Sequence, residues 1–547
     1  MNKGNKVGFF GFIAIVIICL FCVVTFVSKT AGNKDLDSLL KKVDVRTSTP
    51  EKAPISLDNN SLYDELPEIT KYPLSVQGRG QIDIEIFSSP EKAESGSDGW
   101  LVECAENFNS EKITTADGKT ISISVRNVSS GLAADYIISG KYLPDMYTPS
   151  NSLWGDYIDF QAKGRVKLLE ERLVGNTAGF LVKKNSSYND YKQVLDDIVA
   201  GNLNVGYTNP QVSSSGMNLL LNILYNADSQ DISSDNAKNA FASFQNNIPY
   251  VAYNTVQMKS SAALGSLDGM ITEYQSYISD NSLQKNYKFI PYGIRHDNPL
   301  FIVDEGYKTE EELEAMTLVK DYLLNNSCQK LATKYGFNQN DDYESAFSST
   351  GTEVAQALKV YKSEKDSGKD IIAVFVADCS GSMDGAPIYE LKESLTNGMS
   401  YINENNYVGL VSYSSDVVIE LPIAEFDLNQ KAYFQGAINN LVADGGTATY
   451  EALCVGIDMI EKARVDHPDA KCMLFLLSDG MANGMYGLST IEYALTESKI
   501  PVYTISYGSG ADTNALQQLS NINEAASISA DSDDITYKIK SLFNAQL

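Results

Sequence analysis

Apolar runs alternate with amphipathic stretches along most of the chain, and this is the pattern of an α/β fold. In the C-terminal third, apolar runs predict buried strands at residues 371–377, 407–413, 472–477 and 501–506. Apolar side chains at steps of three and four then predict a helix that covers the sheet; they are Ile388, Leu391, Leu395, Met399 and Ile402. Further helices are expected at 448–463 and 535–543. We therefore predict an open, doubly wound sheet with its ligands at the C-terminal strand ends.

Short apolar strands also alternate with helical patterns from residue 81 to residue 345, which predicts a second α/β domain of parallel units. A helix that runs into a polar hinge is expected over 346–370, and the C-terminal domain over 371–547. Residues 30–80 are polar and show little periodicity, so we expect them to form an extracellular stalk.

The N-terminus carries a different pattern. Residues 7–27 contain no charge and are long enough to span a bilayer core, and Lys3 and Lys6 precede them. A cleaved signal peptide is the alternative, although its apolar region is usually shorter. We predict a transmembrane anchor within residues 1–29, with the N-terminus in the cytoplasm. The predicted localisation is the cell membrane, single-pass, with the bulk of the chain on the extracellular side.

Charge and composition narrow the function classes. The formal net charge of −27 argues against nucleic acid as a partner, because nucleic acid requires a basic surface. The two histidines, His296 and His467, are too few for a His-rich zinc site, and a Ser-His-Asp triad would need one of them. The seven cysteines show no paired metal spacing beyond the N-terminal apolar segment and are interpreted as buried free thiols.

Three polar clusters follow predicted strands or turns of the C-terminal domain. The first is Asp378, Ser380 and Ser382, in the pattern D-x-S-x-S. The second is the stretch DGGTATYEAL, which contains Thr447, and the third is Asp479 in FLLSDG. Two carboxylates and three hydroxyls form an all-oxygen set that suits a hard cation such as Mg²⁺.

These clusters resemble the metal-ion-dependent adhesion site of von Willebrand factor type A domains, over about residues 368–547. The resemblance implies that Asp378, Ser380, Ser382, Thr447 and Asp479 surround Mg²⁺ or Mn²⁺, some of them through water. It also implies that an acidic side chain of a protein partner completes the coordination shell.

Serine-rich loops recur in the middle domain, in the stretches FSSPEK, VSSGLAADYI and NPQVSSSGMNLLL. Serines at helix starts cap free N–H groups, and such N–H groups also bind small polar ligands. With SLDGMITEYQSYI, these stretches resemble the two-lobed extracellular solute-binding proteins of bacterial transporters. The resemblance implies a cleft between two α/β lobes, lined by Ser88, Ser89, Ser129, Ser130, Ser213, Ser214 and Ser215. Tyr253, Asp268 and Arg126 are weaker candidates, and a scaffold without a ligand is the alternative.

These observations favour a binding protein over an enzyme, since no histidine or basic residue stands beside the hydroxyls to activate a nucleophile. The first hypothesis is a membrane-anchored surface protein whose metal site binds an acidic group on a protein partner. The second is a solute-binding component of a transport system, with the C-terminal domain as its docking module. A metal-dependent hydrolase is the third, and a lysine or arginine clamp and a phosphate loop would be needed to support it.

Overall fold

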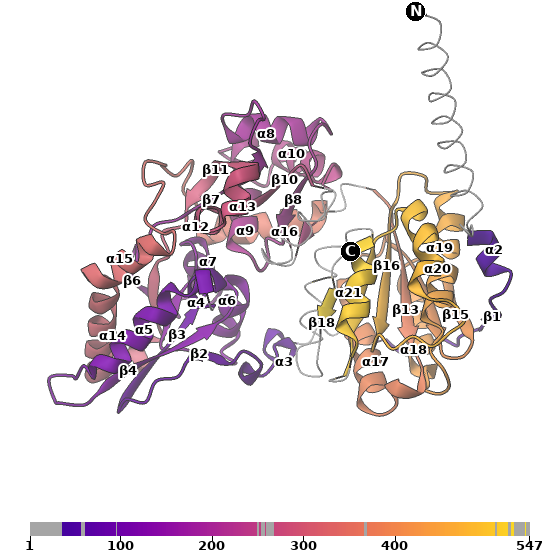
Figure 1. Ribbon diagram of the computed structural model, residues 1–547, viewed down its shortest axis with the longest axis horizontal. Coiled ribbons are helices and arrows are strands. Elements are labelled where there is room, and N and C mark those ends of the chain that lie inside the picture. The colour runs from indigo at the N-terminus through magenta and orange to yellow at the C-terminus, as the bar shows by residue number, and fades with distance from the viewer. Residues whose placement is uncertain are drawn as a thin grey trace, which may run out of the picture.

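The computed structural model describes residues 36–55, 61–94, 96–248, 251–252, 258, 267–365, 369–508, 511–522, 527–529 and 542. It contains three sheets, of seven, six and five strands (Figure 1). The predicted combination of a two-lobed solute-binding-like α/β domain and a doubly wound domain is confirmed.

The seven-stranded sheet belongs to the C-terminal domain and has the order β1-β15-β14-β13-β16-β17-β18. Its strands are β1 (Val45–Thr47), β13 (Ile371–Asp378), β14 (Tyr407–Tyr413), β15 (Val417–Glu425), β16 (Lys471–Ser478), β17 (Val502–Ser506) and β18 (Ser527–Ser529). β13 pairs parallel with both β14 and β16, as a doubly wound sheet requires. β15 runs antiparallel to β14, a reversal that the sequence pattern did not reveal.

Helices cover both faces of this sheet. α17 (Ala386–Gly398) and α18 (Leu428–Asn440) bury apolar residues on one face, and α19 (Thr449–Arg464), α20 (Leu488–Ser498) and α21 (Thr513–Ile522) bury theirs on the other. Along β13, Phe375 belongs to the first core and Val374 and Val376 to the second. Both faces of the strand are therefore buried, which explains its continuous apolar run.

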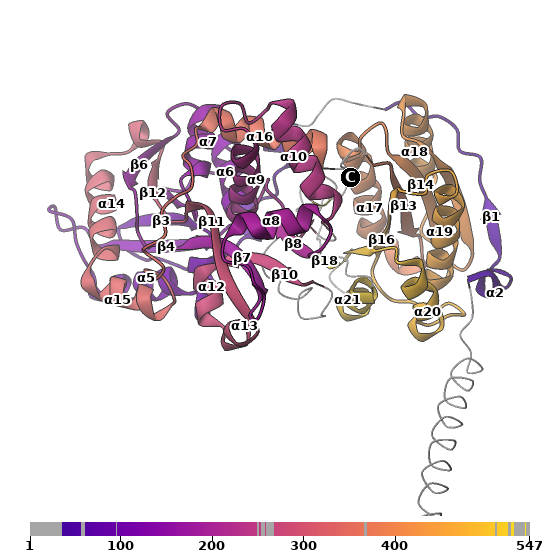
Figure 2. The ribbon, with the colours of Figure 1, turned by 90° about the horizontal axis from the view of Figure 1, so that it is seen from above.

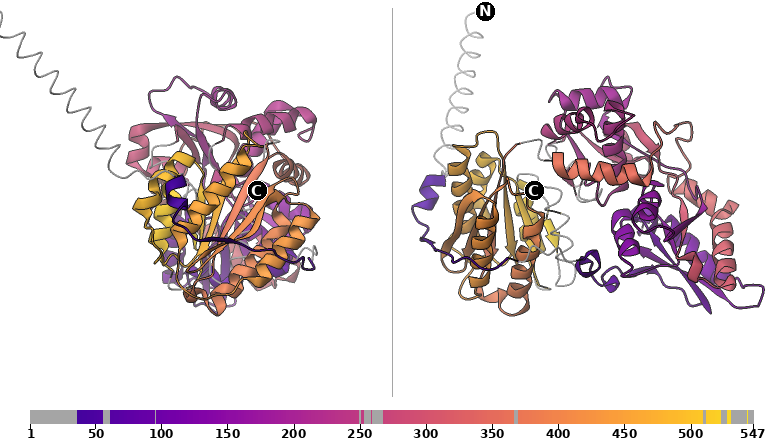
Figure 3. Two further views of the ribbon diagram at one scale, coloured as in Figure 1. Left: turned by 90° about the vertical axis from the view of Figure 1, so that its right-hand side faces the viewer. Right: turned by 180° about the vertical axis from the view of Figure 1, so that it is seen from behind.

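The N-terminal segment is part of the C-terminal domain. α2 (Leu36–Leu40) packs on α19, and β1 pairs parallel with β15 at the edge of the sheet. In Figure 1 these indigo elements lie on the orange and yellow domain, and Figure 3 shows β1 running along its edge. The expected stalk over 30–80 is therefore wrong for residues 36–53, because α2 packs on α19, β1 completes the sheet, and the Ala53 amide donates to the Ala432 carbonyl.

The second half of the expected stalk is also folded. β2 (Leu74–Val76) pairs with β4 (Ile121–Asn127), and the Arg126 guanidinium donates to the Tyr72 carbonyl and, over 2.6 Å, to Glu85. Arg126, a weak ligand candidate in the sequence, therefore holds this segment to the middle domain.

The middle domain has two lobes. The sheet of lobe 1 has the order β2-β4-β3-β5-β12-β6 and that of lobe 2 has the order β11-β7-β10-β8-β9. The remaining strands of lobe 1 are β3 (Ile82–Ser88), β5 (Met146–Thr148), β6 (Val166–Glu170) and β12 (Leu300–Val303). Those of lobe 2 are β7 (Thr177–Lys183), β8 (Val205–Thr208), β9 (Val251–Ala252), β10 (Gly269–Glu273) and β11 (Tyr287–Arg295). β7 pairs antiparallel with β10 and β11 in lobe 2, and β12 pairs antiparallel with β5 and β6 in lobe 1, so the expectation of parallel units is wrong for part of each lobe.

Helices surround both lobes of the middle domain. Lobe 1 carries α3 (Leu62–Glu65), α4 (Pro90–Ala93), α5 (Trp100–Glu111), α6 (Ser130–Ser139), α7 (Leu153–Gln161), α14 (Glu310–Leu323) and α15 (Asn326–Lys334). Lobe 2 carries α8 (Tyr191–Val199), α9 (Ser214–Ala227), α10 (Asp235–Asn246), α12 (Tyr274–Ser279) and α13 (Asn281–Asn286).

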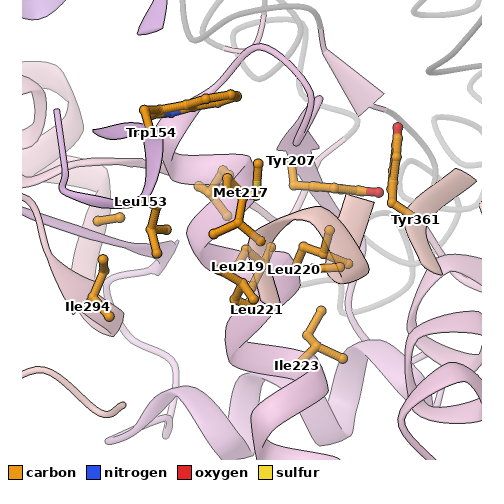
Figure 4. Close-up of a cluster of buried hydrophobic side chains, with 14 of the residues drawn as sticks. Leu153, Trp154, Tyr207, Met217, Leu219, Leu220, Leu221, Ile223, Ile294 and Tyr361 are labelled. Atoms are coloured by element: carbon orange, nitrogen blue, oxygen red, sulfur yellow. The ribbon is translucent and has the colours of Figure 1, made fainter. Parts of the chain in front are cut away.

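A last helix of the middle domain, α16 (Gly351–Glu364), bridges the two lobes. It packs on α7 of lobe 1 and on α9 and α10 of lobe 2 (Figure 2). Its Tyr361 is fully buried and lies beside Tyr207 of lobe 2 (Figure 4). One continuous apolar core therefore extends from lobe 1 through α16 into lobe 2.

The predicted localisation must be corrected. No helix among the described residues is long and apolar enough to cross a membrane. The expected anchor at residues 7–27 lies outside the described residues, as does the expected helix at 535–543 apart from Leu542. The single-pass membrane assignment is withdrawn because no described helix can cross a membrane.

Candidate functional site

The first candidate site lies at the carboxyl end of β13. Asp378 is the last residue of this central strand, and its side chain is fully buried. Its Oδ1 accepts a 2.9 Å hydrogen bond from the Ser380 amide, and its Oδ2 accepts bonds from Ser478 at 2.6 Å and Tyr413 at 3.0 Å. The Ser380 and Ser382 hydroxyls also lie 3.0 Å apart. Together these four contacts fix the loop that follows β13.

The other two predicted residues stand on neighbouring loops. Asp479 follows β16, the strand that pairs with β13, and its negative charge acts on Asp378. Thr447 lies in the loop before α19, which is joined to the Ser380 loop by a 3.1 Å bond from the Gly381 amide to the Gly445 carbonyl. The Thr447 amide donates to Asn483 Oδ1 over 2.7 Å. The fold thus gathers all five predicted positions on adjacent loops at one sheet edge.

Gly445 meets a backbone requirement of this site. Its φ is +80°, a left-handed conformation that glycine adopts without steric cost. A side chain there would also meet the Ser415 hydroxyl at 2.9 Å. The Ser415 hydroxyl in turn accepts from the Gly446 amide over 2.8 Å, which stabilises the turn that presents Thr447.

The electrostatics of the site favour a bound cation. Burial raises the pKa of Asp378 above its usual value, and the charge of Asp479 adds to this rise, while the hydrogen bonds from Ser380 and Ser478 oppose it. Among the described residues, no lysine, arginine or histidine forms an ion pair with either carboxylate. Two nearby buried carboxylates without a basic partner are costly, and a divalent ion offsets that cost.

The donor set fits such an ion. Within the described part of the chain, no group of three or more His, Cys, Asp or Glu side chains could hold a metal. The candidate site offers two carboxylates and three hydroxyls instead, which is the chemistry that Mg²⁺ and Mn²⁺ accept. Tyr413 and Ser478, which orient Asp378, were missed in the sequence. Strand register could have revealed Tyr413, since it pairs with Asp378 across β13 and β14.

The second candidate site lies where the two lobes meet. Ser88 ends β3 and Ser89 follows it, Ser129 and Ser130 follow β4, and Thr148 ends β5. Backbone bonds from Val128 to Ser88 (3.0 Å) and from Ser89 to Thr148 (3.4 Å) bring these three strand ends together. Three buried polar atoms here have no hydrogen-bond partner among the described residues; they are Ser129 Oγ, Thr148 Oγ1 and Asn151 Oδ1.

Lobe 2 brings its own serine loop to the same place. The Gly131 amide of lobe 1 donates to the Val212 carbonyl over 3.2 Å, and the Trp154 indole donates to the Ser214 hydroxyl over 3.0 Å. Ser213 caps α9 through the Gly216 amide, and Ser215 donates to Glu273 over 2.6 Å. The predicted serines therefore do meet at the lobe junction, and several of them serve as caps or inter-lobe contacts.

A buried charged network at this junction was missed in the sequence. The Lys92 ammonium is fully buried and contacts Ser89 at 2.5 Å, Asn298 at 2.7 Å and Glu91 at 3.0 Å. Burial lowers the pKa of Lys92, although the charge of Glu91 opposes the shift. Lys92 is three residues from Ser89 in SSPEK, so the motif itself contained this signal.

His296 does not form a catalytic triad. Its Nδ1 lies 2.8 Å from Glu273 Oε1, and its Nε2 lies 3.0 Å from both Asn151 and Asn218. Ser215 donates to Glu273, and among the described residues no hydrogen bond joins it to the imidazole, whereas a triad needs the histidine beside the serine. Of the two weaker ligand candidates on lobe 2, Asp268 pairs with Lys183 at 2.5 Å, and Tyr253 lies outside the described residues.

Comparisons with known proteins divide the chain in the same way. Residues 373–544 match the von Willebrand factor type A domain, and residues 93–338 match the family described as bacterial extracellular solute-binding protein. The chain combines these two domains. Both belong to classes that bind other molecules.

Curated relatives match the type A domain. Inter-alpha-trypsin inhibitor heavy chain H3 of Mus musculus is 30% identical over 173 residues, which is 29% of this chain and 19% of that protein. The uncharacterized protein sll0103 of Synechocystis is 27% identical over 146 residues, 26% of this chain and 34% of that protein. The chain thus spans about a fifth of the heavy chain's length.

Solved structures resemble each part. A periplasmic thiamin binding protein has a TM-score of 0.39 at 13% identity and covers 53% of this chain and 98% of its own. The sulfate-binding protein SubI from Mycobacterium tuberculosis has a TM-score of 0.35 at 16% identity, covering 48% and 88%. Manganese-loaded TRAP protein of Plasmodium vivax has a TM-score of 0.27 at 18% identity, covering 33% and 75%.

Proposed function

We propose that this protein is a binding protein whose type A domain holds Mg²⁺ or Mn²⁺ and through it an acidic group of a protein partner. The residues that would hold the ion are Asp378, Ser380, Ser382, Thr447 and Asp479. When bound, the ion supplies an electrophilic position that a carboxylate can occupy. The observation that carries the proposal is the pair of buried carboxylates, Asp378 and Asp479, without a basic partner among the described residues.

Hydroxyl groups of the chain orient the Asp378 carboxylate at this site. Ser478 and Tyr413 both donate to Asp378 Oδ2, so they fix the direction in which this carboxylate presents its remaining lone pairs. Hydroxyl ligands are neutral, and the ion therefore keeps net positive charge for an incoming carboxylate. Among the residues that the structure describes here, no group is positioned to activate a nucleophile, which supports binding over hydrolysis.

The experiment uses the full chain and an immobilised peptide with a single glutamate. We expect surface plasmon resonance to record binding in Mg²⁺ or Mn²⁺, loss of binding in EDTA and recovery when metal is restored. A peptide with glutamine at that position is the control. Equal binding of both peptides, or binding in EDTA, would contradict the proposal.

A second candidate function is the capture of a small polar solute by the middle domain, as in a transport component that uses the type A domain as a docking module. The unpartnered Ser129, Thr148 and Asn151 atoms support it, because buried polar atoms without partners are costly unless a ligand satisfies them. A scaffold role remains its competitor, since the lobes already bond directly to each other.

Thermal-shift measurements on the full chain against oxyanions, sugars and amino acids separate these two roles. A transport component should show a raised midpoint for one ligand class, and the double variant Ser129→Ala/Thr148→Val should lose that shift. A panel without any shift supports the scaffold role.

A further inference from the structure

Two buried cysteines face each other on neighbouring helices of lobe 1. Cys104 lies on α5 and Cys328 on α15, and these helices pack directly on each other. Their side chains are 0% and 2% exposed within one apolar core. Both are free thiols in this structure.

Contacts of the surrounding residues hold the helices of Cys104 and Cys328 against each other. The Trp100 indole donates a 2.9 Å hydrogen bond to the backbone carbonyl of Cys328. Cys104 is one helical turn after Trp100, so it lies on the same face of α5 and is directed at the start of α15. Aromatic pairs hold the helices on either side, with Trp100 6.1 Å from Phe337 and Phe108 5.0 Å from Tyr322 between ring centroids.

The two thiols interact with each other. A hydrogen bond between them raises the pKa of Cys104 and lowers the pKa of Cys328. The other three described cysteines show no such pairing. Cys379, Cys454 and Cys472 are each buried, and burial raises the pKa of each.

We propose that Cys104 and Cys328 form a disulfide when the chain folds in the presence of a small-molecule disulfide. The thiolate of one cysteine attacks one sulfur of the oxidant and releases one of its thiolates. The thiolate of the other cysteine then attacks the protein sulfur of the mixed disulfide and releases the second. One oxidant disulfide is reduced to two thiols, which take up the two cysteine protons, while one protein disulfide forms.

The position of this bond in the chain would make it strongly stabilising. The two cysteines are 224 residues apart, and the closed loop contains all of lobe 2. A cross-link over a long loop removes the most freedom from the unfolded chain. The bond would tie the start of lobe 1 to the helix that follows the return from lobe 2.

The test starts from reduced, unfolded full-length chain that is refolded with oxidised glutathione. Free thiols are then alkylated in denaturant and the peptides are mapped by mass. We expect a linked peptide containing Cys104 and Cys328, absent from C104S and C328S and retained in C454S. Reductant should lower the thermal midpoint of the middle domain by about 5–10 °C, and it should leave that of C104S unchanged.

Two outcomes would overturn the proposal. One is full alkylation of both Cys104 and Cys328 after refolding. The other is a link from either residue to a different cysteine. The map of the unsubstituted chain decides between them even where a serine variant fails to fold.

Discussion

The Tyr413 hydroxyl donates a 3.0 Å hydrogen bond to Oδ2 of Asp378, from the strand that pairs with β13. Thr449 lies 3.3 Å behind this hydroxyl and donates to it. A relay from Thr449 through Tyr413 thus orients the carboxylate without contacting the proposed ion. Such outer contacts commonly change metal affinity by about 10- to 100-fold.

Tyr413→Phe is therefore expected to weaken Mg²⁺ binding by about tenfold or more, since it removes one donor and keeps the ring in the core. Isothermal titration calorimetry on the full chain measures this. Tyr389→Phe is the matched control, because Tyr389 is 67% exposed. An unchanged affinity in Tyr413→Phe would show that this hydroxyl does not orient a ligand.

Asp378→Ala is expected to abolish divalent-metal binding in the same titration, because it removes a carboxylate ligand. Asp384→Ala is the control, since Asp384 is an exposed acid two residues beyond Ser382. If both variants bind Mg²⁺ as the parent does, the assignment of the metal site is wrong.

Lys92→Met is expected to destabilise the middle domain by about 3–5 kcal/mol, because it leaves the Glu91 carboxylate without its buried partner. The double variant Glu91→Gln/Lys92→Met removes both charges and should recover much of the loss. Urea unfolding of the parent, Lys92→Met, Glu91→Gln and the double variant measures the coupling between the two residues. Additive losses would indicate that the pair is not coupled.

The pH dependence of α16 follows from its capping box. Burial acts to raise the pKa of Glu353, but hydrogen bonds from Thr350 and Tyr225 outweigh it and lower the pKa below its usual value. An acid with a lowered folded-state pKa stabilises the fold above its unfolded pKa, and that contribution is lost as the pH falls through the folded value. The stability difference between the parent and Glu353→Gln should thus be full at pH 7 and shrink below about pH 4.5. Thermal unfolding between pH 3 and pH 7 measures it, and a constant difference would contradict the assignment.

Gly436→Ala is expected to loosen the N-terminal segment from the type A domain. A Cβ at Gly436 would lie 1.8 Å from the Glu51 carbonyl oxygen, although alanine is the better helix former in α18. Gly487→Ala is the control, because nothing lies within 4 Å of a Cβ there. We expect a loss of about 1–3 kcal/mol for Gly436→Ala alone, measured by thermal unfolding. A gain in stability would show that residue 51 moves away freely.

Sequence reasoning predicted the regular elements well where burial sets the pattern. The apolar run of β13 and the helical spacing of Leu391 and Leu395 appear as expected. β1 escaped prediction because VRT is short and all three residues are exposed, and only its pairing with β15 defines it as a strand. The motif D-x-S-x-S is contiguous in the sequence and could be identified from it directly, whereas the Tyr413 contact to Asp378 depends on strand register.

The lobe junction shows more clearly what sequence patterns alone cannot predict. Serines in three loops were identified from helix starts, which are local signals. The roles of Asn151 and His296, 145 residues apart, depend on how the chain crosses between lobes, and no local pattern encodes that. Lys92 was missed for another reason: its ammonium is fully buried, and lysine is almost never so unless it is paired.

The edge strand β1 has a consequence for the order in which the chain matures. Arg46 of β1 is 370 residues from its partner Asp416. At about 5–20 residues per second, a ribosome needs roughly 20–70 s to produce β15 after it has produced β1. During that interval the whole middle domain emerges and can fold, while residues 36–53 have no sheet to join. The type A domain is therefore completed after the middle domain, and its closing step draws the first described residues of the chain back onto a domain synthesised much later.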